Sequence, residues 1–140
     1  MTTDPNPSPA PEAPPRTAGI TLLLWGIKVI TAGILFYASY LKMTDHQADI
    51  DLFTKLEMEP VGRYLIGGLE GLAALAILVP QSAIYGAFLG FGIMCGAIIG
   101  HLTQIGLNGI QYAIFVALCC ILIMYLRRHD APFIGNLLDK

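Results

Sequence analysis

The sequence predicts an all-α, polytopic membrane protein, a bundle of four transmembrane helices. Two observations lead to that fold class. Of the 140 residues, 55% are hydrophobic and 13% are charged, whereas a soluble domain carries about 25% charged residues. From Gly71 through Leu126 the chain has no Asp, Glu, Lys or Arg. A stretch of that length without a charge cannot form a water-facing surface, so it must lie in hydrocarbon.

Four apolar runs are separated by short polar segments. A helix of about 20 apolar residues crosses the hydrocarbon of a bilayer, because each residue adds about 1.5 Å along the axis. We therefore expect transmembrane spans at residues 20–41, 61–79, 82–102 and 110–126. Together they make one membrane domain over residues 20–128.

The two ends of the chain are predicted to lie outside this domain. Residues 1–19 hold six of the nine prolines and cannot bury a core, so a disordered tail is expected there. Residues 129–140 form a short C-terminal tail.

The connections between spans are short. Residues 42–60 form a polar loop in which Leu52, Phe53 and Leu56 recur at helical spacing. This pattern predicts a short amphipathic helix on the membrane surface. Residues 103–109 are expected to be a short polar connection between the third and fourth spans.

The distribution of basic residues predicts the orientation. Four spans place both termini on one side, and the more basic side of a membrane protein faces the cytoplasm. We therefore expect cytoplasmic termini in a bacterial inner membrane, surrounded by lipid and in contact with a membrane protein or a second copy of the chain. The net charge of −2 gives no sign of a nucleic acid partner. The residues compared are Arg16, Arg127, Arg128 and Lys140 against Lys42, Lys55 and Arg63.

Glu70 is an acidic residue inside an apolar span, with no other charged residue within six positions. A lone ionised carboxylate is very costly in hydrocarbon, so Glu70 must be paired, protonated or hydrated. Lys28 interrupts the first span and lies at a similar depth when counted from the same side. It is therefore a candidate ion-pair partner for Glu70, and the alternative is a lysine that reaches back to the near interface.

Small residues recur along the second and third spans. Spacings of four residues between glycines let two helices approach closely. The glycines expected to pack in this way are Gly67, Gly71, Gly86, Gly90, Gly92, Gly96 and Gly100.

Polar residues gather at the end of the bundle away from the termini. Lys42, Glu70, His101 and Gln111 are the candidate ligand-binding residues there, and Glu70 and His101 are the candidate proton-handling, catalytic groups. A small polar or quinone-like ligand is the kind of molecule such a site would take. The same end also carries Arg63, Gln104 and Asn108.

No metal site is predicted. Asp45, His46 and Asp49 lack a fourth ligand at a recognisable spacing, so we interpret them as solvated loop residues. No Cys-x-x-Cys is present, and the three cysteines lie in apolar runs where a thiol acts as a small hydrophobe. They are Cys95, Cys119 and Cys120.

Three motifs in order resemble the DoxX-like family of small membrane proteins. They are GILFYASYLKMT at residues 33–44, GGLEGLAALAILVP at residues 67–80, and GAIIGHLTQIG at residues 96–106. The resemblance implies a four-helix membrane bundle with Lys42, Glu70 and His101 as its characteristic polar residues. Some members of that family are small subunits of quinone-linked oxidoreductases. Relatives that use thiol chemistry carry paired cysteines that this sequence lacks.

Three functions follow as hypotheses. We favour an accessory subunit or assembly factor of a membrane redox complex, a protein that is not an enzyme on its own. The alternative is a quinone-interacting oxidoreductase subunit with a proton-handling Glu70 and His101. A small transporter is the third hypothesis, although no inverted repeat is visible. No flavin, haem or iron–sulfur motif is recognisable, so a quinone is the one cofactor considered.

Overall fold

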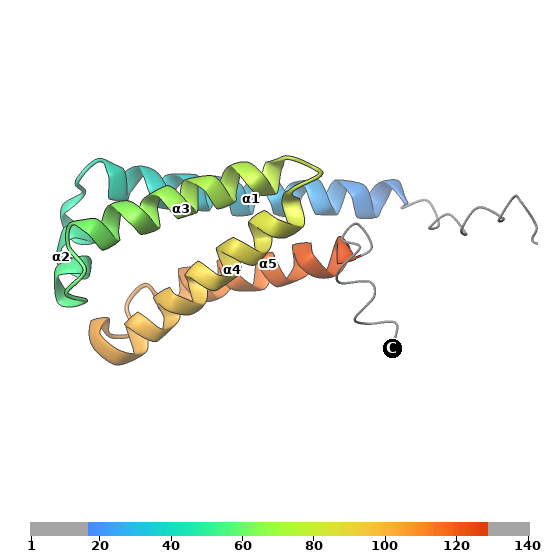
Figure 1. Ribbon diagram of the computed structural model, residues 1–140. Helices are drawn as coiled ribbons and strands as arrows, with labels where there is room; N and C mark the ends of the chain where they lie inside the picture. The colour runs from blue at the N-terminus through green and yellow to red at the C-terminus, as the bar shows by residue number, and fades with distance from the viewer. Residues whose placement is uncertain (1–16, 129–140) are drawn as a thin grey trace, which may run out of the picture.

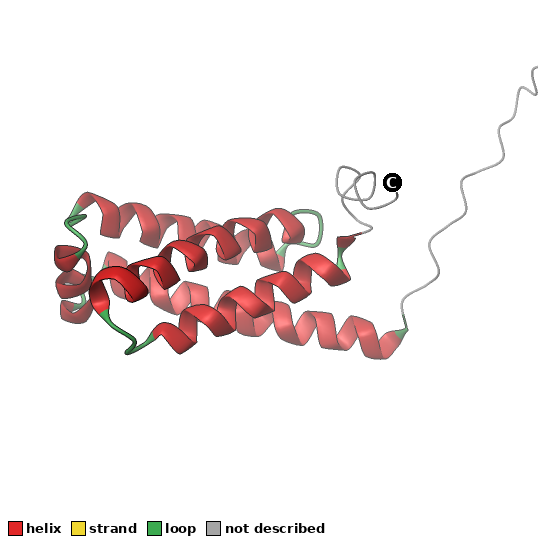
Figure 2. Cartoon of the chain, turned by 90° about the horizontal axis from the view of Figure 1, so that it is seen from below, coloured by secondary structure: helices red, strands yellow, loops and turns green. Residues whose placement is uncertain are grey.

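The computed structural model describes residues 17–128 as four long helices and two short helical segments (Figure 1). The long helices run antiparallel to their neighbours, and α2 lies across one end of the bundle (Figure 1). The elements in order are α1 (Ala18–Met43), α2 (Gln47–Lys55), α3 (Val61–Leu78), α4 (Ala83–Gly100), the π-helical segment η1 (His101–Ile105) and α5 (Ile110–Leu126). Figure 2 shows no strand in this part of the chain.

The predicted all-α membrane bundle is confirmed. By length and apolar composition, α1, α3 and α4 continued through η1 can each cross a membrane, and α5 is a shorter apolar helix of 17 residues. The helices begin and end within a few residues of the expected spans. Helix α1 begins at Ala18, inside the segment expected to be a tail. Residues 1–16 and 129–140, the rest of the two predicted tails, lie outside the described residues.

Small side chains make up much of the core of the bundle, beside larger ones such as Leu35, Ile77 and Ile123. Helix α3 packs against α1 and α4, and α5 packs against α4 and α1. Ala73, Ala74, Ala87 and Cys120 are completely buried in it. Small side chains let helices pack closely in a membrane, where lipid is as apolar as the side chains themselves.

Glycines mark where the helices touch. A Cβ atom on Gly86 would lie 2.6 Å from the backbone nitrogen of Ile77, so α3 and α4 are in backbone contact there. On α3, Gly67 lies against Lys42 and Gly71 lies against Ser39 of α1. Two more of the predicted glycines have neighbours: Gly90 lies close to Cys120 of α5, and Gly100 is in ordinary van der Waals contact with Leu56 and Ile105.

The packing expected of Gly92 and Gly96 is wrong. Nothing lies within 4 Å of a Cβ atom built on either residue, and both are exposed. The reason is the path of α4, which meets α3 at their connecting turn and then diverges from it (Figure 1). A spacing of four residues places glycines on one face of a helix, but it does not say whether a neighbour covers that face.

The connections that precede α3 and α5 also differ from the prediction. The predicted amphipathic helix exists as α2, yet it covers the end of the bundle instead of turning its apolar face to lipid: Phe53 is buried, and α2 contacts α1, α3 and η1. The expected polar connection after the third span begins as helix, because α4 continues into η1. The chain then turns at Gly106 and Gly109, whose φ angles of +97° and +90° favour glycine.

Candidate functional site

A cavity of about 600 Å³ opens where α3 and α4 diverge. Its walls are mostly apolar and come from α2, α3, α4 and η1. Phe88, Gly92 and Gly96 of α4 line the cavity and are exposed, so the cavity is open along this side of α4. Leu52 and Phe53 of α2, together with Leu56 directly after it, line its end.

A second cavity of about 700 Å³ lies between α1 and α5. Its apolar wall includes Leu35 and Ala38 of α1 and Ala113 and Val116 of α5. Tyr112, at the start of α5, lies at its rim and is exposed. The bundle is therefore hollow on two sides at the same end.

Four polar residues line both cavities: Lys42, Asp49, Glu70 and His101. We call these four residues the polar partition. They come from α1, α2, α3 and η1 respectively, so four segments far apart in sequence meet at this point. A molecule in either cavity would meet the same charged and hydrogen-bonding groups.

Lys42 is the ion-pair partner of Glu70. The Nζ atom of Lys42 lies 3.1 Å from Oε2 of Glu70 and 3.7 Å from Oδ1 of Asp49. The Glu70 side chain is 4% exposed, and its Oε2 accepts no well-directed hydrogen bond in the described structure. The charge of Glu70 is thus balanced by Lys42, while the hydrogen-bonding capacity of the buried Oε2 is not fully used.

The predicted pair between Lys28 and Glu70 is wrong. Lys28 donates a hydrogen bond of 3.4 Å to the carbonyl oxygen of Leu78 and lies 4.2 Å from the centre of the Trp25 ring. Leu78 lies eight residues beyond Glu70, about 12 Å along a helix. The first turns of α1 extend beyond the end of α3 (Figures 1 and 2), so counting depth from the end of each apolar run placed Lys28 too deep.

His101 is held by a turn of unusual geometry. Its Nδ1 lies 3.0 Å from the carbonyl oxygen of Gly106, and the backbone nitrogen of Gly106 donates to the carbonyl of His101. A carbonyl oxygen only accepts, so the proton is on Nδ1 and the neutral ring keeps Nε2 as an acceptor. That nitrogen lies near Gly109, at the second cavity. The π-helical turn of η1 thereby fixes the ring of His101.

Gln111 does not line either cavity, and its side chain is exposed. The same is true of Gln104 and Asn108. A role of Gln111 in ligand binding therefore stays a prediction.

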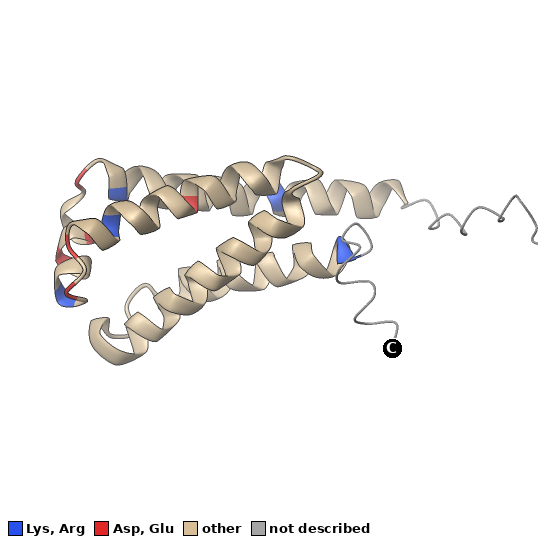
Figure 3. Cartoon of the chain, in the orientation of Figure 1, with Lys and Arg blue, Asp and Glu red and all other residues tan. Residues whose placement is uncertain are grey.

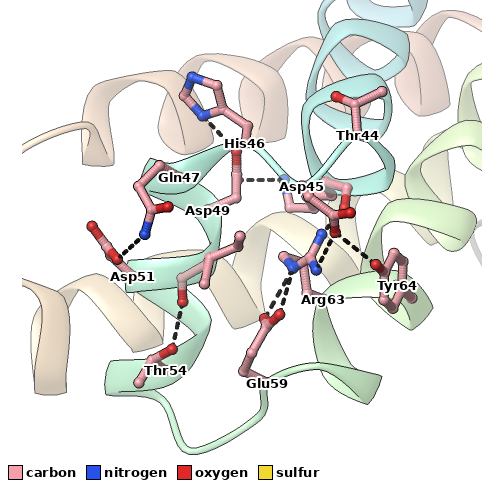
Figure 4. Close-up of polar contacts among 12 residues, drawn as sticks. Thr44, Asp45, His46, Gln47, Asp49, Asp51, Thr54, Glu59, Arg63 and Tyr64 are labelled. Atoms are coloured by element: carbon pink, nitrogen blue, oxygen red, sulfur yellow. Dashed lines mark hydrogen bonds and ion pairs between the residues drawn. The ribbon is translucent and has the colours of Figure 1, made fainter.

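Arg63 is buried and fixes the loop before α2 (Figure 4). It donates to Glu59 at 2.9 Å, to Asp45 at 2.7 Å and to the backbone carbonyl of Lys42. The hydroxyl of Tyr64 donates to Asp45 at 2.6 Å. This hydrogen bond from Tyr64, together with the one from Arg63, lowers the pKa of Asp45. Arg63 therefore belongs to the scaffold that holds the backbone of Lys42, rather than to the cavities.

Asp49 is the residue of the polar partition that sequence reasoning missed. It is not a solvated loop residue, because its side chain is 17% exposed and lies beside Lys42. Leu52 and Phe53 follow Asp49 by three and four residues, so the three residues share one face of α2, and Leu56 continues that spacing directly after the helix. Reading that face as buried would have placed Asp49 toward the bundle.

The groups of the site suit binding and proton transfer. Among residues 17–128 no three His, Cys, Asp or Glu side chains are placed to hold a metal ion. The polar partition supplies an ammonium donor, two carboxylate acceptors and an imidazole acceptor at the border of two apolar cavities. Such a site can orient an amphipathic molecule and exchange protons with it.

Comparison with known proteins adds the family. No curated protein and no solved structure matches the chain. A sequence model of the DoxX-like family matches residues 26–125, which include all four residues of the polar partition. The match covers more than half of the chain and agrees with the helical membrane bundle described above. The chain therefore belongs to the DoxX-like family.

Proposed function

We propose that this protein binds a lipid-soluble quinone at the polar partition and serves a membrane redox complex as an accessory subunit. The observation that supports this most is that one set of polar residues lines two apolar cavities. Cavities that bind small molecules commonly have volumes of about 300–1,000 Å³ and mostly apolar walls with a few polar groups. Both cavities are of that kind.

The opening beside α4 suits a ligand with a long apolar chain. Gly92 and Gly96 leave the side of the cavity free of side chains, and Phe88 next to them faces outward. A quinone could place its ring at the polar partition while its chain stays in lipid. This arrangement would avoid moving the chain out of hydrocarbon, which costs about 0.8 kcal/mol for each CH₂ group.

The polar partition offers partners to both forms of a quinone. The carbonyl oxygens of the oxidised form accept hydrogen bonds, and the ammonium group of Lys42 is a donor. The hydroxyl groups of the reduced form donate. The carboxylate of Glu70, whose buried Oε2 lacks a well-directed hydrogen bond, and Nε2 of His101 are acceptors. These side chains transfer protons and not electrons, so a bound quinone would exchange electrons with a partner protein. We propose an accessory role because the electrons would come from, or go to, that partner protein.

The binding test uses the purified protein in lipid nanodiscs and a decyl-chain benzoquinone. We expect saturable binding, and we expect Glu70→Gln to weaken it about tenfold. This corresponds to the loss of one hydrogen bond to a charged group, at about 1.4 kcal/mol per factor of ten. Glu57→Gln is the matched control, because Glu57 is exposed and lines neither cavity.

Empty nanodiscs correct for quinone dissolved in lipid. Binding no greater than theirs, or equal binding by the Glu70→Gln and Glu57→Gln variants, contradicts the proposed site. The accessory role has a separate test, isolation from native membranes in mild detergent. Quinone-dependent electron transfer should co-purify with the protein, and turnover of quinone by the purified protein alone would argue against an accessory role.

A further inference from the structure

We propose that Asp49 and His46 connect Glu70 to water, as a path for one proton between the site and the aqueous face. The path rests on the proposed function in one respect, because the proton it carries is taken from or given to the bound quinone. Its residues were interpreted as solvated on sequence grounds, and the structure places them beside the polar partition.

The distances define a continuous series of side chains. Glu70 Oε2 lies 3.1 Å from Lys42 Nζ, Lys42 Nζ lies 3.7 Å from Asp49 Oδ1, and Asp49 Oδ2 lies 3.4 Å from His46 Nδ1. Figure 4 shows the His46 ring turned toward Asp49. Exposure rises along the series, from 4% at Glu70 through 12% and 17% to 49% at His46. The series therefore begins at a buried carboxyl group and ends at a ring in contact with water.

The charges of the series favour one mobile proton. With both carboxylates ionised, Lys42 protonated and His46 neutral, the four groups carry a net charge of −1. One further proton makes them neutral, and it can be held by Glu70 at the inner end or by His46 at the outer end. Moving the proton between these two groups leaves the net charge unchanged, so the path avoids building an unbalanced charge in a medium of low polarity.

Each transfer moves one proton and no electron. Lys42 gives a proton to the carboxylate of Asp49 and regains one from the carboxyl group of Glu70. Asp49 then passes its proton to His46 Nδ1, and His46 releases one to water. The gaps of 3.4 and 3.7 Å are closed by a side-chain rotation or one bridging water, as is common when catalytic groups are seen without ligand.

The other polar groups near this end of the bundle do not form a path from Glu70 to water. His101 faces the cavities from η1, and its Nδ1 is used by Gly106. Tyr112 of α5 lies at the rim of the second cavity. Arg63 of α3 is held by Glu59 and Asp45. The ion pairs of Lys42 and Asp49 join Glu70 to the half-exposed ring of His46.

The experiment is infrared spectroscopy of the reconstituted protein during a pH jump. The C=O stretch of protonated Glu70 is identified as the band that Glu70→Gln removes. We expect His46→Asn and Asp49→Asn to slow the change of this band about a hundredfold, the lower end of the effect of a positioned proton-transfer group. Asp51→Asn is the matched control, since Asp51 is an exposed residue of α2 that bonds to Gln47.

Circular dichroism checks that the variants are folded. His46 is half exposed, so the His46→Asn variant keeps the test available if Asp49→Asn unfolds the protein. A Glu70 band that does not respond to pH, or that responds equally fast in the His46→Asn and Asp51→Asn variants, overturns the path. Quinone binding is measured on the same samples. Its absence in the wild type refutes the proposed function, and the infrared result still decides whether Glu70 communicates with water through α2.

Discussion

Each end of the bundle holds a largely buried lysine, and the two lysines have different kinds of partners. At the end where α3 turns into α4, Lys28 lies against the last carbonyl of α3 and over the ring of Trp25. At the end covered by α2, Lys42 lies between the carboxylates of Glu70 and Asp49. Figure 3 shows that the acidic residues of the described chain gather at the α2 end or on α3 near it.

The packing of α3 against α4 also differs between the two ends of the bundle. At the turn end the backbones of α3 and α4 touch at Gly86, and no cavity lies between them at that point. At the α2 end the helices diverge, and two cavities share the polar partition. Lys28 is thus a structural cation that satisfies the end of a helix, whereas Lys42 holds a carboxylate at the edge of open space. A charged residue in an apolar helix is therefore a candidate functional residue when a cavity lies beside it.

The largest expected effect separates the two lysines. Lys42→Met should lower the free energy of unfolding by about 3–5 kcal/mol, because it leaves Glu70 buried without its counter-charge. Lys28→Met should lower it less, by about 2 kcal/mol, the size of one desolvated cation–π contact, because no carboxylate loses its counter-charge. Reversible unfolding in mixed detergent micelles measures both.

A double variant serves as the control for this prediction. Lys42→Met combined with Glu70→Gln should recover part of the loss, since neither charge is then left alone. If Lys28→Met is as damaging as Lys42→Met, the two ends do not differ in the way described.

A second, smaller effect tests the packing of the two ends. Gly86→Ala should destabilise the protein by about 1–3 kcal/mol, the usual cost of overpacking, because its Cβ would lie 2.6 Å from a backbone atom of Ile77. Gly92→Ala should stabilise it by up to about 1 kcal/mol through helix propensity alone, because nothing lies within 4 Å of its Cβ. Equal effects of the two changes, measured by the same unfolding assay, would contradict a closed turn end and an open α2 end.

The smallest effect concerns the loop that supports the α2 end. The pKa of Asp45 in the folded protein is lower than its ordinary value of 3.8, mainly through the hydrogen bond from Tyr64. A lowered pKa means that Asp45 stabilises the fold above about pH 4 and that this contribution is lost as pH falls through the folded pKa. The wild type and Asp45→Asn should therefore differ in unfolding temperature at neutral pH and converge in acid.

Tyr64→Phe is the companion variant, because it removes the largest cause of the shift and keeps the carboxylate beside Arg63. It should show a smaller difference from the wild type than Asp45→Asn at neutral pH. If the difference in unfolding temperature between the wild type and Asp45→Asn grew toward acid, the ionised Asp45 side chain would not be stabilising the fold.

The sequence by itself determined the membrane fold. Long apolar runs between charged segments leave few ways to satisfy backbone hydrogen bonds in lipid other than helices, so the helices and their approximate ends follow from composition. It also identified Glu70 as a carboxylate that needs a partner. Local patterns sufficed for these points because each depends on the cost of placing one group in hydrocarbon.

The tertiary structure alone decided the partners. Three features depend on the register of α1 against α3 and on the angle between α3 and α4. They are the pairing of Glu70 with Lys42 in place of Lys28, the position of Asp49 beside Lys42, and the open faces of Gly92 and Gly96. A shift of one helix by eight residues moves a side chain about 12 Å along the axis, and the composition of the helices would not change. Depth and spacing are properties of one helix, whereas an ion pair or a cavity is a property of several helices and their relative positions.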